Sequence, residues 1–307
     1  MEKYIFSTYL VKVTKEKNDL ILSLFNGQDD FLDFGKKFFD EIYKTIQKSA
    51  DSKELSTLHL TLEEPPIIDY EKRCIYGFLS SGVSGEDYKI KDITTNKNVF
   101  TVNKNHAPFR DVFFYLQIPK NKDFGALILQ RKSKFGIKTI FTKSINQFAK
   151  NIGFVGYNIQ VNNIIHGKVY NRMIKDGNLK RIEFIKHKIP RDIASFYENG
   201  GNVDLIPGTL KTSMSASKLP DNFKNFVDRL FNNSNRERIE INDVDDFEEV
   251  EFELELNGKR KTFYVVHRNK IQPDIDVTKD LQYFDNEITI ESFVIQAESL
   301  IEEVIYL

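Results

Sequence analysis

The sequence has one cysteine, no tryptophan and no long apolar run. The single cysteine, Cys74, excludes an internal disulfide and a cysteine-rich zinc site. No segment approaches the ~18 consecutive apolar residues of a membrane-spanning helix. Residues 1–13 lack the layout of a signal peptide and have the pattern of a strand. We therefore expect a cytoplasmic protein with no membrane association, in which Cys74 is buried within a strand.

Motifs for metals and nucleotides are also missing. The five histidines never lie three or four residues apart, so no metal-ligand spacing occurs, and we expect no metal and no cofactor. No G-x-x-x-x-G-K-[ST] motif is present. Gly82-Val83-Ser84-Gly85 is not the G-x-S-x-G elbow, and we interpret residues 80–85 as a hairpin loop. His106 fits a surface loop better than an acid–base role.

Apolar and aromatic residues are plentiful. Hydrophobic residues make up 40% of the 307-residue chain, and phenylalanine alone contributes 26 residues, so a sizeable core can form. The length allows one large domain or two ordinary ones. Abundant lysine, asparagine and isoleucine suggest an A/T-rich bacterial genome.

The pattern of apolar residues predicts an α+β fold. We expect residues 1–119 to form a sheet-rich domain with one long helix over 31–48, capped by Asp30. Its expected strands cover 4–13, 20–25, 57–62, 73–79, 87–92, 98–102 and 111–118. A boundary near 119–124 then leads into a basic α/β domain over 120–307, with a further boundary possible near 233–248. Here the expected strands are 125–130, 157–162 and 179–187, and the expected helices are 137–150, 164–176, 190–198, 220–232 and 289–305.

The clearest local signal lies at residues 250–266. Asn257-Gly258 separates two runs of alternating apolar and polar residues, which is typical of a two-residue hairpin because both turn residues need positive φ. In that register Phe252 faces Phe263 and Glu255 faces Arg260. The strand before the turn then has an acidic outer face formed by Glu251, Glu253 and Glu255.

Charge is distributed unevenly, although the net charge is only −1. Residues 120–191 contain 16 Lys/Arg against three acids, a net charge of +13, whereas residues 237–255 have a net charge of −9. A helix exposed to solvent normally mixes both signs. Unbalanced cations favour a polyanionic partner, because lysine and arginine release condensed counterions from phosphates. The alternatives are a solvated basic face and neutralisation by the acidic segment of the same chain.

The candidate nucleic-acid contacts are the cations of this basic region. Arg131, Lys132 and Lys134 precede an expected helix near Gly136, whose N-terminal amides favour anions. This junction is a candidate phosphate seat. The full set of expected contact residues is Arg131, Lys132, Lys134, Lys138, Lys143, Lys150, Lys168, Arg172, Lys175, Lys180, Arg181 and Lys186.

The same junction resembles a group of uncharacterised bacterial proteins encoded among phage-defence genes. The similarity covers residues 110–191 and consists of an apolar-Gln-Arg segment followed by Gly136-Ile137-Lys138-Thr139. It implies a setting in antiviral defence and supplies no catalytic residues.

Nucleic-acid binding, to DNA or RNA, is therefore the leading functional prediction, and an enzyme is the less favoured one. A metal-dependent nuclease using Asp69, Asp87 and Lys89 is one alternative. A second is an interaction subunit of a defence complex, or a homo-oligomer, whose acidic and basic surfaces bind partners. The acidic stretch is either a solvated strand face or a phosphate mimic that masks the basic region.

Overall fold

The structure is a computed structural model of the whole chain. It describes residues 3–49, 57–131, 137–164, 167–188, 207–232, 239–241, 245–268, 271, 274–285 and 287–305. These residues form two compact units. Unit 1 comprises Met1–Asn162 and Pro273–Leu307, and unit 2 comprises Asn163–Gln272. The fold class is α+β, as the sequence predicts.

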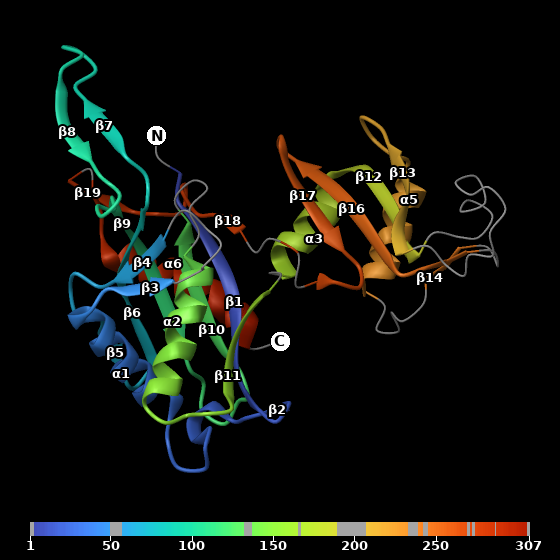
Figure 1. Cartoon of the computed structure of the whole chain (residues 1–307). Coiled ribbons are helices and arrows are strands. Elements are labelled where there is room, and N and C mark those ends of the chain that lie inside the picture. The colour runs from blue at the N-terminus through green and yellow to red at the C-terminus, as the bar shows by residue number, and fades with distance from the viewer. Residues whose placement is uncertain are drawn as a thin grey trace. The chain divides into compact units, whose positions relative to one another are not determined.

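A twisted antiparallel sheet organises unit 1 (Figure 1). Its strands follow the order β11-β1-β10-β9-β6-β4-β3, and β2, β5 and β18 pair with β1 or β6. The strands of this sheet are β1 (Ile5–Lys15), β2 (Asn18–Asp19), β3 (Gln47–Ser49), β4 (Thr57–Thr61), β5 (Ile67–Asp69), β6 (Cys74–Ser84), β9 (Phe109–Gln117), β10 (Gly125–Arg131), β11 (Tyr157–Asn163) and β18 (Asp274–Asp276). Two further strand pairs complete the unit, namely β7 (Tyr88–Lys91) with β8 (Asn98–Val102) and β19 (Tyr283–Phe284) with β20 (Glu287–Ile288).

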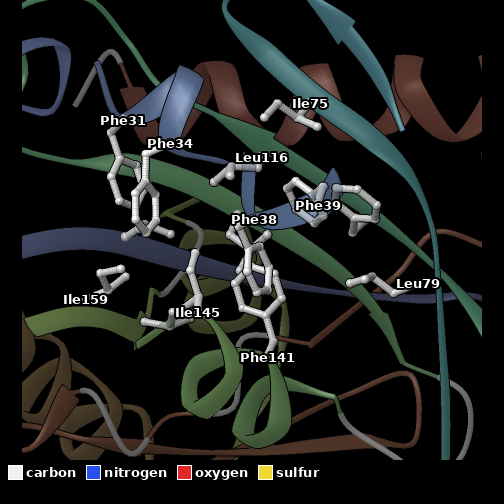
Figure 2. Close-up of a cluster of buried hydrophobic side chains, with 14 of the residues drawn as sticks. Phe31, Phe34, Phe38, Phe39, Ile75, Leu79, Leu116, Phe141, Ile145 and Ile159 are labelled. Carbon is white, nitrogen blue, oxygen red and sulfur yellow. The ribbon is translucent and has the colours of Figure 1, made fainter. Parts of the chain in front are cut away.

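Two helices cover one face of this sheet. α1 (Phe31–Lys44) begins after Asp30, whose side chain accepts a hydrogen bond from the Leu32 amide at 2.9 Å, so the predicted cap is confirmed. α2 (Lys138–Asn151) packs beside it. Their phenylalanines meet strand side chains in one buried cluster (Figure 2). Each fully buried ring stabilises the fold by about 1.5–3 kcal/mol, so this core outweighs the cap in holding α1.

The opposite face of the sheet is covered by α6 (Ile290–Ile305). Phe293 of α6 stacks on Phe113 of β9 at 5.1 Å between ring centroids, and Phe6 of β1 stacks on Phe113 at 5.6 Å. Figure 1 shows α2 in front of the sheet and α6 behind it. Unit 1 therefore has three layers, helix, sheet and helix.

The two strands that lead into and out of unit 2, β11 and β18, lie along the same edge of β1. β10 pairs with Ile5–Val11 along the first edge of β1. β18 pairs with residues 5–7 and must occupy the second edge, where β11 also lies. The chain leaves unit 1 at the end of β11 and re-enters it just before β18. Unit 2 is therefore an insertion between two strands that share one edge of β1.

Unit 2 is built on a four-stranded antiparallel sheet in the order β13-β12-β16-β17. Its core joins one face of this sheet to two helices through Tyr170, Val227, Phe231, Phe252 and Phe263. The elements are α3 (Gly167–Asp176), β12 (Asn178–Lys188), β13 (Pro207–Ser215), α5 (Asp221–Asn232), β14 (Ile239–Ile241), β15 (Asp245–Phe247), β16 (Glu249–Leu256) and β17 (Lys259–Tyr264). β14 and β15 form a separate pair.

The predicted hairpin is confirmed residue by residue. Phe252 pairs with Phe263 and Glu255 with Arg260. Asn257 has φ 51° and Gly258 has φ 74°, the positive values that the two-residue turn requires.

The structure corrects three expectations. The strands on either side of the expected boundary at 119/120, β9 and β10, pair in one sheet, so the units divide at 162/163 and 272/273 instead. Residues 20–25 contain a short 3₁₀ helix, η1 (Leu22–Leu24), rather than a strand. Residues 80–84 continue β6 instead of forming a loop, because they pair with β9, with Gly82 opposite Phe109. A side chain at position 82 would collide with the Pro108 carbonyl, so glycine permits this close pairing. The expected helix at 190–198 lies outside the described residues.

Candidate nucleic-acid interface

Arg131 has a structural role at the end of β10. Its guanidinium forms an ion pair with Asp274 of β18, and the Asp274 carboxylate also accepts a hydrogen bond from the Ser7 hydroxyl at 2.6 Å. These contacts tie β18 to the β1–β10 pair. Lys132, Lys134 and Gly136, the other residues of the expected phosphate seat, lie outside the described residues.

The next helix, α2, contains three lysines and no acid. Lys138 is half-buried with its ammonium 5.1 Å from the centroid of the Tyr9 ring, and burial lowers its pKa. Lys143 and Lys150 are exposed, and so are Thr139, one turn before Lys143, and Gln147 between the two lysines. The spacing of these four residues places them along one side of the helix.

The start of α2 has no side-chain cap. Its N-cap residue is Ile137, whose side chain cannot accept a hydrogen bond from the first-turn amides. The first turn contains no acid either. The positive end of the helix dipole and Lys138 therefore reinforce each other at this end.

In unit 2, α3 presents Arg172 and Lys175 to solvent, while the Lys168 side chain lies outside what the structure describes. The Tyr170 hydroxyl donates to Asp228 of α5 at 2.8 Å and fixes the two helices together. Both the burial of the ring and this bond raise the Tyr170 pKa. α3 is thus a firmly held helix with exposed cations.

The cations of β12 have partners inside unit 2, and their role in nucleic-acid contact stays a prediction. Lys180 lies 3.2 Å from Glu255 of β16. Arg181 lies 3.2 Å from Glu183 and 4.0 Å from Glu253. Lys186 is placed 5.2 Å from the centroid of the Phe247 ring. These side chains already have partners in the same unit.

We call the chain of contacts across this sheet the ion-pair ladder. It runs over all four strands in the order Lys211, Glu183, Arg181, Glu253, Arg260, Glu255 and Lys180. Hydrogen bonds from Arg260 and then Lys180 lower the pKa of Glu255. The acidic outer face predicted for β16 is confirmed, and two of its three carboxylates, Glu253 and Glu255, pair with cations of β12 and β17. Side chains from Glu237 to Asp246 lie outside the described ones, so masking by this part stays a prediction.

Sequence analysis missed a buried carboxylate at the start of β16. Glu249 is 1% exposed, and it accepts hydrogen bonds from the amides of Val250, Val266 and His267 at 2.8–3.0 Å. The His267 ring nitrogen Nδ1 lies 2.6 Å from the same carboxylate. The predicted hairpin register, extended by three residues, places Glu249 opposite Val266, so this contact was accessible from the sequence.

Sequence analysis also missed the exposure of β7 and β8, although it predicted both strands. Every residue of β7 and four of the five in β8 are exposed. His106, next to this pair, is exposed and stacks on Phe100 at 5.8 Å, as expected of a surface loop histidine.

The residues of the nuclease alternative have other surroundings. Asp69 ends β5 and accepts the Lys72 amide at 2.8 Å, whereas Asp87 precedes β7 and Lys89 lies on it. Within the described ranges, no group of three or more His, Cys, Asp or Glu residues is arranged to hold a metal ion. Cys74 is buried in β6, as predicted, and burial raises its pKa.

Comparison with protein-family models and with curated proteins finds no match to this chain. None of the helices in the described part of the chain has the length and apolar character needed to cross a membrane.

Proposed function

We propose that the protein binds nucleic acid through the phosphate backbone, with α2 as the main contact in unit 1 and α3 as a second contact in unit 2. The acid-free outward side of α2 carries the proposal. Lys143 and Lys150 are held about ten Å apart by a rigid helix (seven residues at 1.5 Å each), and both are exposed.

The ion-pair ladder narrows the choice of contacts. A cation that already has a carboxylate partner gains less from a phosphate, because it must first give up that partner. Lys180, Arg181 and Arg131 are in this position. Within the described ranges, Lys150, Arg172 and Lys175 have no carboxylate partner, so α2 and α3 supply the favoured contacts.

The uncapped start of α2 offers a second kind of phosphate contact. Backbone amides at a helix N-terminus bind phosphate without distinguishing bases. Contacts of these kinds give affinity without sequence preference. We therefore expect binding to depend strongly on salt and weakly on sequence. A setting in antiviral defence stays a prediction that rests on the resemblance alone.

A salt titration tests the proposal. If about five phosphates are contacted, the plot of log affinity against log salt has a slope near −4.5, and a fourfold rise in salt weakens binding by roughly 500-fold. Removing two contacts by Lys143→Gln and Lys150→Gln should bring the slope to about −2.7. Fluorescence anisotropy with short labelled DNA and RNA oligonucleotides measures both values.

The matched control is Lys37→Gln with Lys279→Gln. It removes two exposed lysines of the same unit that belong to other segments, Lys37 on α1 and Lys279 after β18. We expect it to leave the slope close to that of the wild type. A slope near zero in the wild type would exclude backbone binding, and equal losses in the two double variants would show that only net charge matters.

A further inference from the structure

The connection between β6 and β9 is itself a two-stranded ribbon. We call β7, β8 and the turn between them, residues 88–102, the ribbon. Its pairs are Tyr88 with Val102, Lys89 with Thr101 and Ile90 with Phe100. Figure 1 shows it extending beyond the end of the unit 1 sheet, where it forms a sheet of its own.

Large apolar side chains are exposed along the ribbon and at its tip. Ile90 is 47% exposed, Phe100 53%, Val99 67% and Ile93, in the turn, 100%. A two-stranded hairpin with no further packing is only marginally stable in water. Apolar clusters that are exposed at this level mark interaction sites. Both strands and the tip are accessible. The shape therefore suits a partner with a groove whose two walls can contact both sides of the ribbon.

The charge of the ribbon favours a polyanionic groove. Residues 88–104 contain Lys89, Lys91, Lys97 and Lys104 against one acid, Asp92. The Asp92 carboxylate is exposed and accepts hydrogen bonds from the amides of Thr94 and Thr95 in the turn, at 2.8 and 2.7 Å. Lys89, Lys91 and Lys97 are exposed. Glu86 and Asp87 lie only at the base, so cations dominate the part that projects.

We propose that the ribbon enters the minor groove of duplex DNA, with Ile93 as a wedge between base pairs and the lysines on the flanking phosphates. This proposal rests on the proposed function and names duplex DNA as its substrate. Apolar side chains at the tip of a minor-groove element unstack a base step and bend the duplex by about 20–90°. The ribbon then contributes bending, while α2 contributes salt-dependent affinity.

The test separates bending from binding. The probe is a short mixed-sequence DNA duplex with an A/T-rich centre and a fluorophore at each end, so that bending raises energy transfer. We expect wild-type protein to raise the energy transfer when it binds. We expect Ile93→Ala to bind the duplex as well but to leave the energy transfer at the value of the free duplex. Ile295→Ala is the matched control, because Ile295 is 54% exposed on α6. Lys89→Gln with Lys91→Gln should reduce the salt slope by about 1.8.

Each outcome decides between the proposals. Binding without bending in the wild type, or bending retained in Ile93→Ala, overturns the ribbon proposal and leaves backbone binding intact. Tighter binding to single strands than to the duplex overturns it too. Loss of self-association in Ile93→Ala, with unchanged DNA binding, would identify a second copy of the chain as the occupant. No binding to any oligonucleotide would reject the proposed function itself.

Discussion

At the scale of single residues, Glu249 of unit 2 is a buried carboxylate that depends on nearby hydrogen-bond donors. A buried carboxylate is tolerated only when its oxygens are well supplied with donors. Three backbone amides and the His267 ring meet that need. One amide belongs to β16 and two belong to the residues that follow β17, so this one side chain links the start of β16 to the segment just after β17.

We expect Glu249→Gln to destabilise unit 2 by about 1–3 kcal/mol, because the amide that replaces one oxygen would face N–H donors and leave them unsatisfied. Urea unfolding measures the loss. Glu251→Gln is the control, since Glu251 lies two residues further along the same strand on its half-buried outer side. Equal losses in the two variants would contradict a special role for Glu249.

At the scale of elements, the ion-pair ladder determines how the unit 2 sheet responds to pH. Glu255 accepts hydrogen bonds from Arg260 and Lys180, which favour its charged form and lower its pKa. A carboxyl whose pKa is lower in the folded state stabilises the fold at any pH above its unfolded value of about 4.3. This stabilisation is lost as pH falls through the folded pKa.

The variant Glu255→Gln isolates this effect. We expect the difference in urea midpoint between wild type and variant to be constant from neutral pH down to about pH 5.5, and to shrink as the pH falls below about 4.5. Glu302→Gln, an exposed change on α6, supplies the control for general charge effects. A difference that grew on acidification would show that the ladder does not favour ionised Glu255.

The elements also show what the sequence could predict. The hairpin of β16 and β17 was predictable in register because the Asn257-Gly258 turn and the period of two are local signals. The four longer helices of the described residues, α1, α2, α5 and α6, were predictable from apolar spacing for the same reason. The extension of β6 through Gly82 was not, because its cause is the approach of Phe109, which is 27 residues away.

The candidate site was predictable only in part, because partners far apart in sequence decide which cations are available. Arg131 pairs with Asp274, which is 143 residues away in the sequence, and no local sequence pattern predicts that contact. Part of the ion-pair ladder was predictable, because the hairpin register places Glu255 opposite Arg260. The addition of Lys180 depends on β12 pairing with β16, which the sequence leaves open.

At the scale of the whole molecule, the insertion of unit 2 predicts that the units are separable. Each has its own buried core, and the described core residues of one cluster do not include those of the other. Both connections meet unit 1 along one edge of β1. Termini at one edge allow an insertion to be removed with little disturbance to the host.

Replacing residues 163–272 by a short Gly-Ser linker should leave unit 1 folded, with one cooperative thermal transition followed by circular dichroism. As a comparison, removing α6 from the full chain should abolish the transition of unit 1, because Phe6 and Phe113 lose their cover. A linker variant with no cooperative transition would show that unit 1 depends on unit 2.

The insertion also sets an order of events during synthesis. Ile5 leaves the ribosome before its partner Asp276, which follows about 270 residues later, a delay of tens of seconds at roughly 5–20 residues per second. All strands of the unit 2 sheet are made within that interval. Unit 2 can therefore fold while one edge of β1 still waits for β18. An open strand edge is a template for pairing with another chain, so this interval is when a nascent copy is most exposed to misassembly with its neighbours on the same messenger RNA.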